Sequence, residues 1–312
     1  MAFIKLYVFD VWAWQCLFIS NPNNPYDSTL IDCWFKPPVS KNEKTPLDYL
    51  AEKWLLWVNE NWYILWNLII TNYDFDHFKW IKYLTDNISI WKIICSNNIS
   101  TYQLKRLKWN QRVYKEIFDR LYLLKNRSSN DWVTRTSSFN IFTVCAKIDE
   151  NWNNYNTNNL SLITTICVFN TIIVIPWDLE TEWWEILLWD TFVKEAIKKA
   201  DIFVASHHWR DNWLPEWVRN LLLENTFLRC AIISDKSIEY ETQDWMTSLY
   251  DTFIQTWIKY YKFNWSKITL NWKNTVTSYN CDIRKVLTTR NDWNFVITIF
   301  DNWELIAEEF YM

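Results

Sequence analysis

The feature that most restricts this chain is its complete lack of glycine: its 312 residues include no Gly and 25 Trp. Glycine ordinarily makes up about 7% of a globular chain, which corresponds to roughly 22 residues here. A fold of this size needs residues that accept positive φ in tight turns, and glycine does so without steric cost. Either other residues occupy those turns, or tryptophan stands where glycine is meant.

The positions of the tryptophans favour the second explanation. Asn-Gly and Asp-Gly are the strongest short hairpin signals, whereas a bulky residue is strained in the left-handed region. Nine tryptophans directly follow Asn or Asp, namely Trp62, Trp132, Trp152, Trp213, Trp245, Trp265, Trp272, Trp293 and Trp303. We therefore hypothesise that UGA codons of this gene encode glycine at most of these positions. The alternative is a genuinely Trp-rich protein, and the intact mass of the protein from its own source distinguishes the two.

Composition excludes several classes of protein. The net charge is -4, and no block of Lys and Arg marks a nucleic-acid-binding surface, although a nucleic-acid substrate remains open. No apolar run is long enough to span a membrane, and the N-terminus lacks a signal-peptide pattern. The seven cysteines contain no Cys-x-x-Cys pair and mostly lie in apolar runs. Reduced thiols and a cytoplasmic location are therefore expected.

The order of the predicted elements indicates a layered α/β chain. Apolar runs bounded by polar turns predict strands over 3–9, 15–20, 28–32, 67–71, 91–95, 138–146, 160–169, 171–175, 202–206 and 231–234. Helical spacing is found over 45–58, 75–84, 100–125, 182–200, 214–224 and 248–258. The tail from residue 260 reads as hairpins. Strands and helices interleave in two halves, which predicts one domain over 1–312 with a helical insertion around 100–126.

All three histidines of the chain share one context with isolated acidic residues. His77, His207 and His208 each follow a short apolar strand, and so do Asp76 and Asp178. Loops at strand ends carry function in α/β proteins, and imidazole and carboxylate groups from several strand ends are the ligands of Zn²⁺, Mn²⁺ or Fe.

Each residue alone also has a structural explanation. Asp76 or Asp178 could cap a helix, and the paired histidines could lie at the surface. Cys33 could approach a metal, although a buried thiol is the simpler explanation. Lys236 and Arg290 could hold a substrate anion or be ordinary solvated charges.

Several segments of the chain together resemble a known family. With Trp read as Gly, "FDVWAWQCLFI" and "STLIDCWF" resemble the opening of the metallo-β-lactamase fold, in the form of the soluble hydrolase domain of the competence protein ComEC. "NYDFDHFKW" is similar to the family's His-x-His-x-Asp-His motif, "IPWDLE" to its Gly-Asp motif and "ASHHWR" to its His-His-Gly motif. "ISDKSIEYETQD" and "VLTTRNDW" resemble late segments of stand-alone members of this group, so the resemblance spans nearly the whole chain. The resemblance implies a four-layer αββα sandwich, an α/β fold with metals at one edge of its two sheets.

The same resemblance implies the roles of the site residues. The metal ligands it implies are Asp74, Asp76, His77, Asp178 and His207. The usual site holds two metals with five His and two Asp, which a chain with three His cannot supply. One half-site is complete, whereas Asn72 and Asp74 stand where the other has histidines. One firm ion is expected, Zn or Mn, with a second bound weakly through Asp74 and Asp178.

The remaining assignments complete the expected centre. Asp32 and Asn72 are expected to support the ligands from behind, and Asp74, Asp76 and His208 are the candidate catalytic side chains. A glycine at position 177 would let the backbone turn so that Asp178 faces the metals, whereas a real Trp177 should distort the site.

These residues predict metal-dependent hydrolysis through a metal-activated water. The substrate suggested by the resemblance is a phosphodiester or ester, with nucleic acid or a nucleotide among the candidates. The alternative is a binding or regulatory module that kept the fold and lost turnover, because half of the usual metal site is eroded. The sequence does not determine the oligomeric state.

Overall fold

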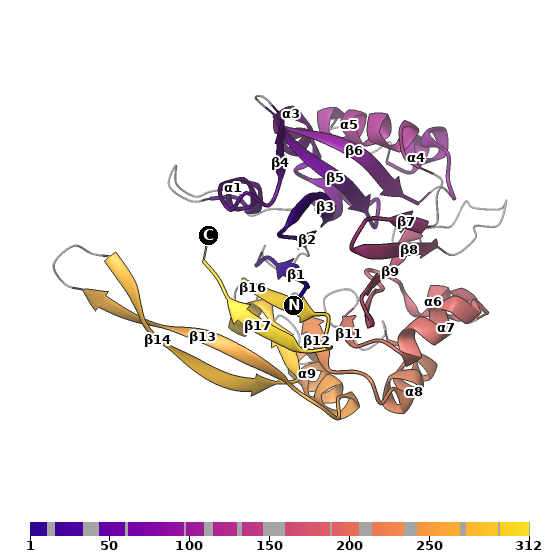
Figure 1. Cartoon of the computed structure of the whole chain (residues 1–312). Coiled ribbons are helices and arrows are strands. Elements are labelled where there is room, and N and C mark those ends of the chain that lie inside the picture. Colours follow the sequence, from indigo (N-terminus) through magenta and orange to yellow (C-terminus); the bar gives the residue numbers. More distant parts are fainter. Residues whose placement is uncertain are drawn as a thin grey trace.

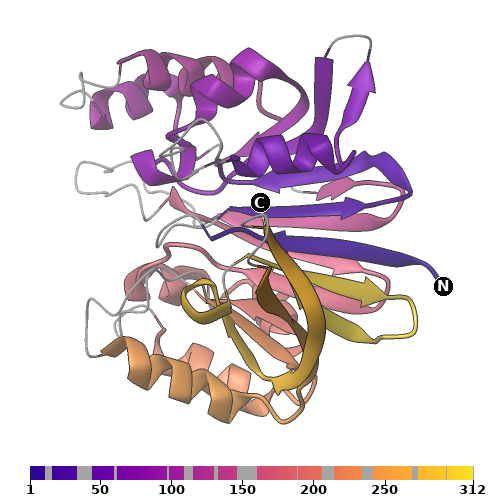
Figure 2. The same cartoon turned by 90° about the vertical axis from the view of Figure 1, so that its left-hand side faces the viewer.

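The fold is described from a computed structural model of the chain (Figures 1 and 2). The described residues are 1–10, 16–33, 44–59, 62–96, 98–108, 115–129, 133–145, 160–187, 189–205, 214–233, 242–268, 273–292 and 294–311. Side chains are not described at 242–246, 263–279 and 290–291.

Ten of the described strands form the first sheet. Nine of them follow the order β14-β13-β17-β16-β1-β2-β3-β5-β4, and the tenth, β6, also pairs with β5. Their bounds are β1 Phe3–Val8, β2 Leu17–Asn21, β3 Asn24–Ile31, β4 Trp57–Asn59, β5 Trp62–Ile70, β6 Ile88–Cys95, β13 Ile258–Ile268, β14 Lys273–Arg284, β16 Phe295–Phe300 and β17 Leu305–Glu309. β3 and β5 run parallel, which brings their C-terminal ends to the same edge.

The second sheet contains seven of the described strands, in the order β15-β12-β11-β10-β9-β8-β7. They are β7 Val133–Arg135, β8 Phe139–Cys145, β9 Leu162–Val168, β10 Thr171–Ile175, β11 Ile202–Val204, β12 Cys230–Ile233 and β15 Val286–Thr288. β9 and β10 form a hairpin, and Phe169 in its two-residue turn has φ 51°. β10, β11, β12 and β15 are mutually parallel, so their C-terminal ends also share one edge.

The two sheets pack face to face across an apolar core. Ile4, Leu6 and Val8 of β1 point into this core, where they meet residues of β9 and β10 such as Ile166 and Ile173. The alternate side chains of β1 point to the opposite face, because successive residues of a strand face opposite sides. Tyr7 on that face is buried in a second apolar core, and β11 and β12 are buried along their whole length, which explains why the central strands read as apolar runs.

Helices cover both outer faces, as Figure 2 shows. On the first sheet, Leu50, Leu84 and Leu121 belong to a core beneath the helices α1 Pro46–Glu52, α2 Phe75–Phe78, α3 Ile81–Asn87, α4 Thr101–Leu107 and α5 Lys115–Asn126. On the second, Trp184 and Leu222 join a core beneath α6 Thr181–Leu187, α7 Thr191–Lys198, α8 Glu216–Glu224 and α9 Thr242–Phe253. The short α10, Thr289–Asp292, follows β15. The architecture is thus the predicted α/β αββα sandwich.

The predicted helix over 45–58 is too long, because α1 ends at Glu52. The amide of Trp54 bonds to the carbonyl of Ala51, and the amide of Leu55 bonds to the carbonyl of Leu50. With Trp54 at φ 58°, this is a Schellman ending, in which the left-handed position is usually glycine. The chain then turns into β4, which pairs with β5.

The predicted helix over 182–200 is two helices. Asp190 has extended backbone angles, and its side chain accepts hydrogen bonds from the amides of Phe192 and Val193. It therefore caps α7 and separates it from α6. The helix expected from 248 begins earlier, at Thr242, and ends at Phe253, before β13.

The predicted helical stretch around 100–126 contains α4 and α5. The tail forms the β13–β14 and β16–β17 hairpins, and the first of these extends away from the sandwich in Figure 1. No helix among the described residues is long and apolar enough to cross a membrane.

Candidate metal centre

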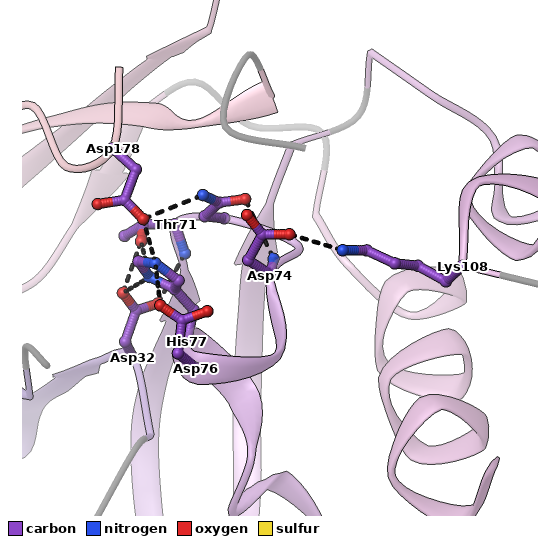
Figure 3. A network of polar contacts seen from close by, with 8 residues as sticks. Asp32, Thr71, Asp74, Asp76, His77, Lys108 and Asp178 are labelled. Carbon is purple, nitrogen blue, oxygen red and sulfur yellow. Dashed lines mark hydrogen bonds and ion pairs between the residues drawn. The ribbon is translucent and has the colours of Figure 1, made fainter. Parts of the chain in front are cut away.

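The candidate residues of the two sheets meet at one edge of the sandwich. Asp32 directly follows β3, Asp76 and His77 lie in α2 after β5, and Asp178 follows β10. Figure 3 shows the side chains of Asp32, Asp76 and Asp178 gathered around His77. The edge therefore joins groups from both sheets, because β3, β5 and β10 all end there.

The buried carboxylate of Asp32 holds the ring of His77 from behind. Asp32 Oδ2 lies 2.7 Å from His77 Nδ1. Thr71 fixes this carboxylate, with its amide donating to Oδ1 at 2.8 Å and its hydroxyl to Oδ2 at 2.6 Å. Asp32 has φ 57°, a conformation that aspartate tolerates better than most residues. With this acceptor at Nδ1, the imidazole would keep its Nδ1 proton when a metal is bound, and Nε2 would be the nitrogen that binds the metal.

Two further carboxylates face Nε2. Asp178 Oδ2 lies 2.5 Å and Asp76 Oδ2 3.4 Å from this nitrogen. Asp76, His77 and Asp178 each offer one ligand atom, and these three atoms all lie within 4.8 Å of one another. His77 and Asp178 are buried, while Asp76 is partly exposed. The group could hold a metal ion.

The electrostatics of the group reflect three acidic residues around one imidazole. Burial raises the pKa of Asp76 to about 6, opposed by His77 and reinforced by Asp178 and Asp74. Burial by itself would lower the pKa of His77, but Asp178, Asp32 and Asp76 raise it well above its ordinary value. Burial also raises the pKa of Asp32, while His77 and Thr71 oppose the rise. Without a cation, the group therefore retains protons that a metal would displace.

The donor set fits a divalent cation. Two carboxylates and an imidazole are ligands shared by Zn²⁺, Mn²⁺ and Fe sites. A cation among them would neutralise carboxylates that otherwise repel each other. Asp76, His77 and Asp178 would hold the ion, while Asp32 would orient the imidazole.

Asp74 does not join this group. Its Oδ1 atom lies 2.6 Å from Nζ of Lys108, the residue that ends α4. In Figure 3 the Asp74 carboxylate lies between the His77 cluster and Lys108. Asp74 occupies the cap position of α2 without a side-chain capping bond, and Asp76 lies inside the helix. Helix capping therefore does not explain either residue.

Asn72 supports the neighbouring backbone and carboxylate. Its Nδ2 donates to Asp178 Oδ2 at 3.2 Å, and its Oδ1 accepts a bond from the amide of Asp74 at 3.1 Å. The side-chain amide of Asn72 thus positions the Asp178 carboxylate, although Asn72 is not one of the three candidate ligands.

Trp177 takes the expected left-handed backbone conformation, with φ 53°. Its side chain is 1% exposed, and its ring centroid lies 5.9 Å from that of His77. The indole N–H is buried and has no hydrogen-bond partner among the described residues. Asp178 nevertheless faces His77, so the distortion expected from a tryptophan at this position is not seen.

The predicted His207, His208 and Lys236 lie outside the described residues, as does the side chain of Arg290. Cys33 is fully buried, and its amide donates to the carbonyl of His77, which ties the chain after β3 to α2.

Sequence reasoning missed two polar residues of this edge. Thr71 directly follows an apolar strand, a position that could have marked it. Lys108 is 34 residues from Asp74 along the chain and has no local signal.

No family model matches the sequence, and no curated protein matches it. Among solved structures, a proposed metal-dependent hydrolase from Parabacteroides distasonis is 14% identical with a TM-score of 0.42, covering 80% of this chain and 91% of that one. A possible metal-dependent hydrolase from Veillonella parvula is 10% identical with a TM-score of 0.40, covering 75% of this chain and 85% of that one.

A third similar structure is CmlA, a diiron β-hydroxylase from Streptomyces venezuelae. It is 14% identical with a TM-score of 0.38, and the match covers 64% of this chain. The chain spans only 34% of the length of that hydroxylase. Likenesses of this size do not assign the chain to a family.

Proposed function

We propose that this chain is a metal-dependent hydrolase that cleaves phosphodiesters. The observation that carries the proposal is the group formed by Asp76, His77 and Asp178, in which Asp32 directs the imidazole toward both carboxylates. Such a second layer of hydrogen bonds is typical of metal-ligating histidines. The resemblance to the hydrolase domain of ComEC supports a phosphodiester, with nucleic acid or a nucleotide as candidate substrates and an ester as the other possibility.

The side chains divide the work at this edge. A divalent ion held by Asp76, His77 and Asp178 would supply a nucleophile near neutral pH, because such ions acidify water. Asp32 keeps the proton of His77 on Nδ1, and Asn72 holds Asp178. Asp76 is the most exposed member of the group, and we assign to it the role of orienting a reacting water.

The first experiment combines metal analysis with turnover. Elemental analysis should find Zn or Mn in the purified protein, and bis-p-nitrophenyl phosphate should be hydrolysed in its presence. His77→Ala and Asp178→Asn should abolish both, while Asp119→Asn, an exposed change on α5, should alter neither. Turnover that persists in the two ligand variants would contradict the proposal.

One observation favours the alternative of a binding or regulatory module. Asp74, which stands at a histidine position of the incomplete half-site, is already paired with Lys108. Metal bound at the expected level without hydrolysis of any phosphodiester or ester tested would support this alternative.

We also propose that glycine stands at Trp54, Trp177 and Trp303 in the functional protein, through the reading of UGA as glycine. Among the described residues, five have positive φ, and these three tryptophans are among them. Trp54 holds the usual glycine position of a Schellman ending, and Trp303 lies in the β16–β17 turn. The intact mass of the protein from its own source tests the proposal, and a mass that requires 25 Trp would reject it.

A further inference from the structure

The partner of Asp74 is an unusual lysine. Only 5% of the Lys108 side chain is exposed, compared with 31% of Asp74. Removing an ammonium from water is costly unless a carboxylate compensates it. The Lys108 side chain is therefore a buried, paired charge at this edge of the sandwich rather than a solvated surface charge.

The fold fixes this ammonium in place. α4 begins with a capping box, in which Ser100 and Gln103 satisfy each other's backbone amides. Leu104 is fully buried in the core over the first sheet, and the amide of Lys108 bonds back to the Leu104 carbonyl. The charge is thus held by a short, well-anchored helix.

The charges at this edge indicate what the ammonium replaces. The carboxylates at this edge are those of Asp32, Asp74, Asp76 and Asp178. The charge of one divalent ion would not balance their combined negative charge. Asn72, on the strand exit beside Asp74, offers only an amide, and that amide already contacts Asp178 and the Asp74 backbone. The Asp74 carboxylate thus already has a protein cation at 2.6 Å, on the side of the centre where a second ion would need it.

We propose that the centre binds a single divalent ion and that the ammonium of Lys108 takes the place of a second one. Lys108 neutralises Asp74 and so prevents it from recruiting a further cation. It acts as a positioning residue that sets the number of ions in the centre. The inference rests on the proposed metal-dependent function.

The test is the metal stoichiometry of the full chain, measured by elemental analysis after equilibration with Mn²⁺ and removal of free ion. The wild-type protein should hold about one Mn²⁺ per chain, and Lys108→Gln should hold about two, because Asp74, once freed, can share a second ion with Asp178 through hard carboxylate oxygens. Lys108→Arg keeps the charge and should stay at about one. If Lys108→Gln does not fold, Lys108→Met, which keeps the aliphatic stem, carries the same expectation.

A matched control is available on the next helix. Lys125 in α5 is also buried, and its ammonium bonds to the carbonyl of Ser96 rather than to a carboxylate of the centre. Lys125→Gln should leave the count at about one, as a general loosening of the helices should not add an ion.

The outcomes separate this inference from the proposed function. Two ions in the wild-type protein, or one ion in both folded neutral variants, would overturn the role of Lys108 while leaving a metal centre. No ion in the well-folded wild-type protein would overturn both.

Discussion

At the scale of single residues, the centre depends on the orientation of one imidazole. Asp32, itself fixed by Thr71, is hydrogen-bonded to Nδ1 of His77, so Nε2 faces the carboxylates of Asp76 and Asp178. Asp32→Asn should weaken metal affinity about 10- to 100-fold without unfolding the protein. Calorimetric titration with Mn²⁺ measures this effect, and the exposed Asp119→Asn serves as the control. Unchanged affinity in Asp32→Asn would show that orientation does not matter.

The same group makes metal binding depend on pH. Burial raises the pKa of Asp76 to about 6, and its neighbours raise the pKa of His77 well above its ordinary value. The deprotonated forms bind the ion, so protons compete with it. Affinity should therefore increase as pH rises through about 6, and binding should release protons to the buffer. Titrations in buffers of different ionisation enthalpy count these protons, and Asp76→Asn should release fewer.

The tryptophans at positive φ give a stability prediction. Trp303→Gly and Trp54→Gly should each stabilise the protein by about 0.5–1 kcal/mol, because the strain relieved exceeds the entropy cost of glycine. Both side chains are largely exposed, so little packing is lost. Trp91→Gly on β6 is the control and should destabilise the protein, because Trp91 is not at positive φ and stacks on Trp66. Urea unfolding measures all three, and a loss of stability in the first two would count against the glycine proposal.

At the scale of elements, α4 depends on its N-terminus. Its seven residues are too few for a helix that is stable alone, so the Ser100 capping box and the burial of Leu104 must fix it. Ser100→Ala should cost about 1 kcal/mol of unfolding free energy. Urea unfolding tests this expectation, with Ser89→Ala, at an exposed position of the strand β6, as the control outside any helix.

The strands were the most predictable elements, because burial on both faces leaves apolar runs that end at polar residues. The helix ends were less predictable. α1 ends because Trp54, which follows the helix, takes a left-handed conformation that a tryptophan in the sequence does not predict. α7 is separated from α6 because Asp190 caps it, although the surrounding sequence has a helical pattern. His77, Asp76 and Asp178 could be selected from the sequence because each follows a strand. Lys108 could not, because only the packing of α4 on the first sheet brings it to Asp74.

At the scale of the whole molecule, the candidate ligands come from both sheets. Asp76 and His77 follow the first sheet and Asp178 follows the second, so a bound ion would link the two. Binding to the folded state alone should add about 2.7 kcal/mol of stability at a free ion concentration 100 times the Kd. Thermal unfolding with Mn²⁺ and with EDTA measures this gain. In Asp178→Asn most of it should disappear, and an equal gain in that variant would show that the ion binds elsewhere.

The thiol of Cys33 offers a way to observe this edge open in solution. It is fully buried one residue after Asp32, burial raises its pKa well above the ordinary value, and its backbone is bonded to His77 and Trp80. An alkylating reagent can therefore reach it only when the backbone of Cys33 separates from His77 and Trp80, whereas the exposed Cys281 reacts without such an event. The ratio of the Cys33 labelling rate to the Cys281 labelling rate therefore measures how often this edge opens. We expect this ratio to fall when a metal ion is bound at the centre.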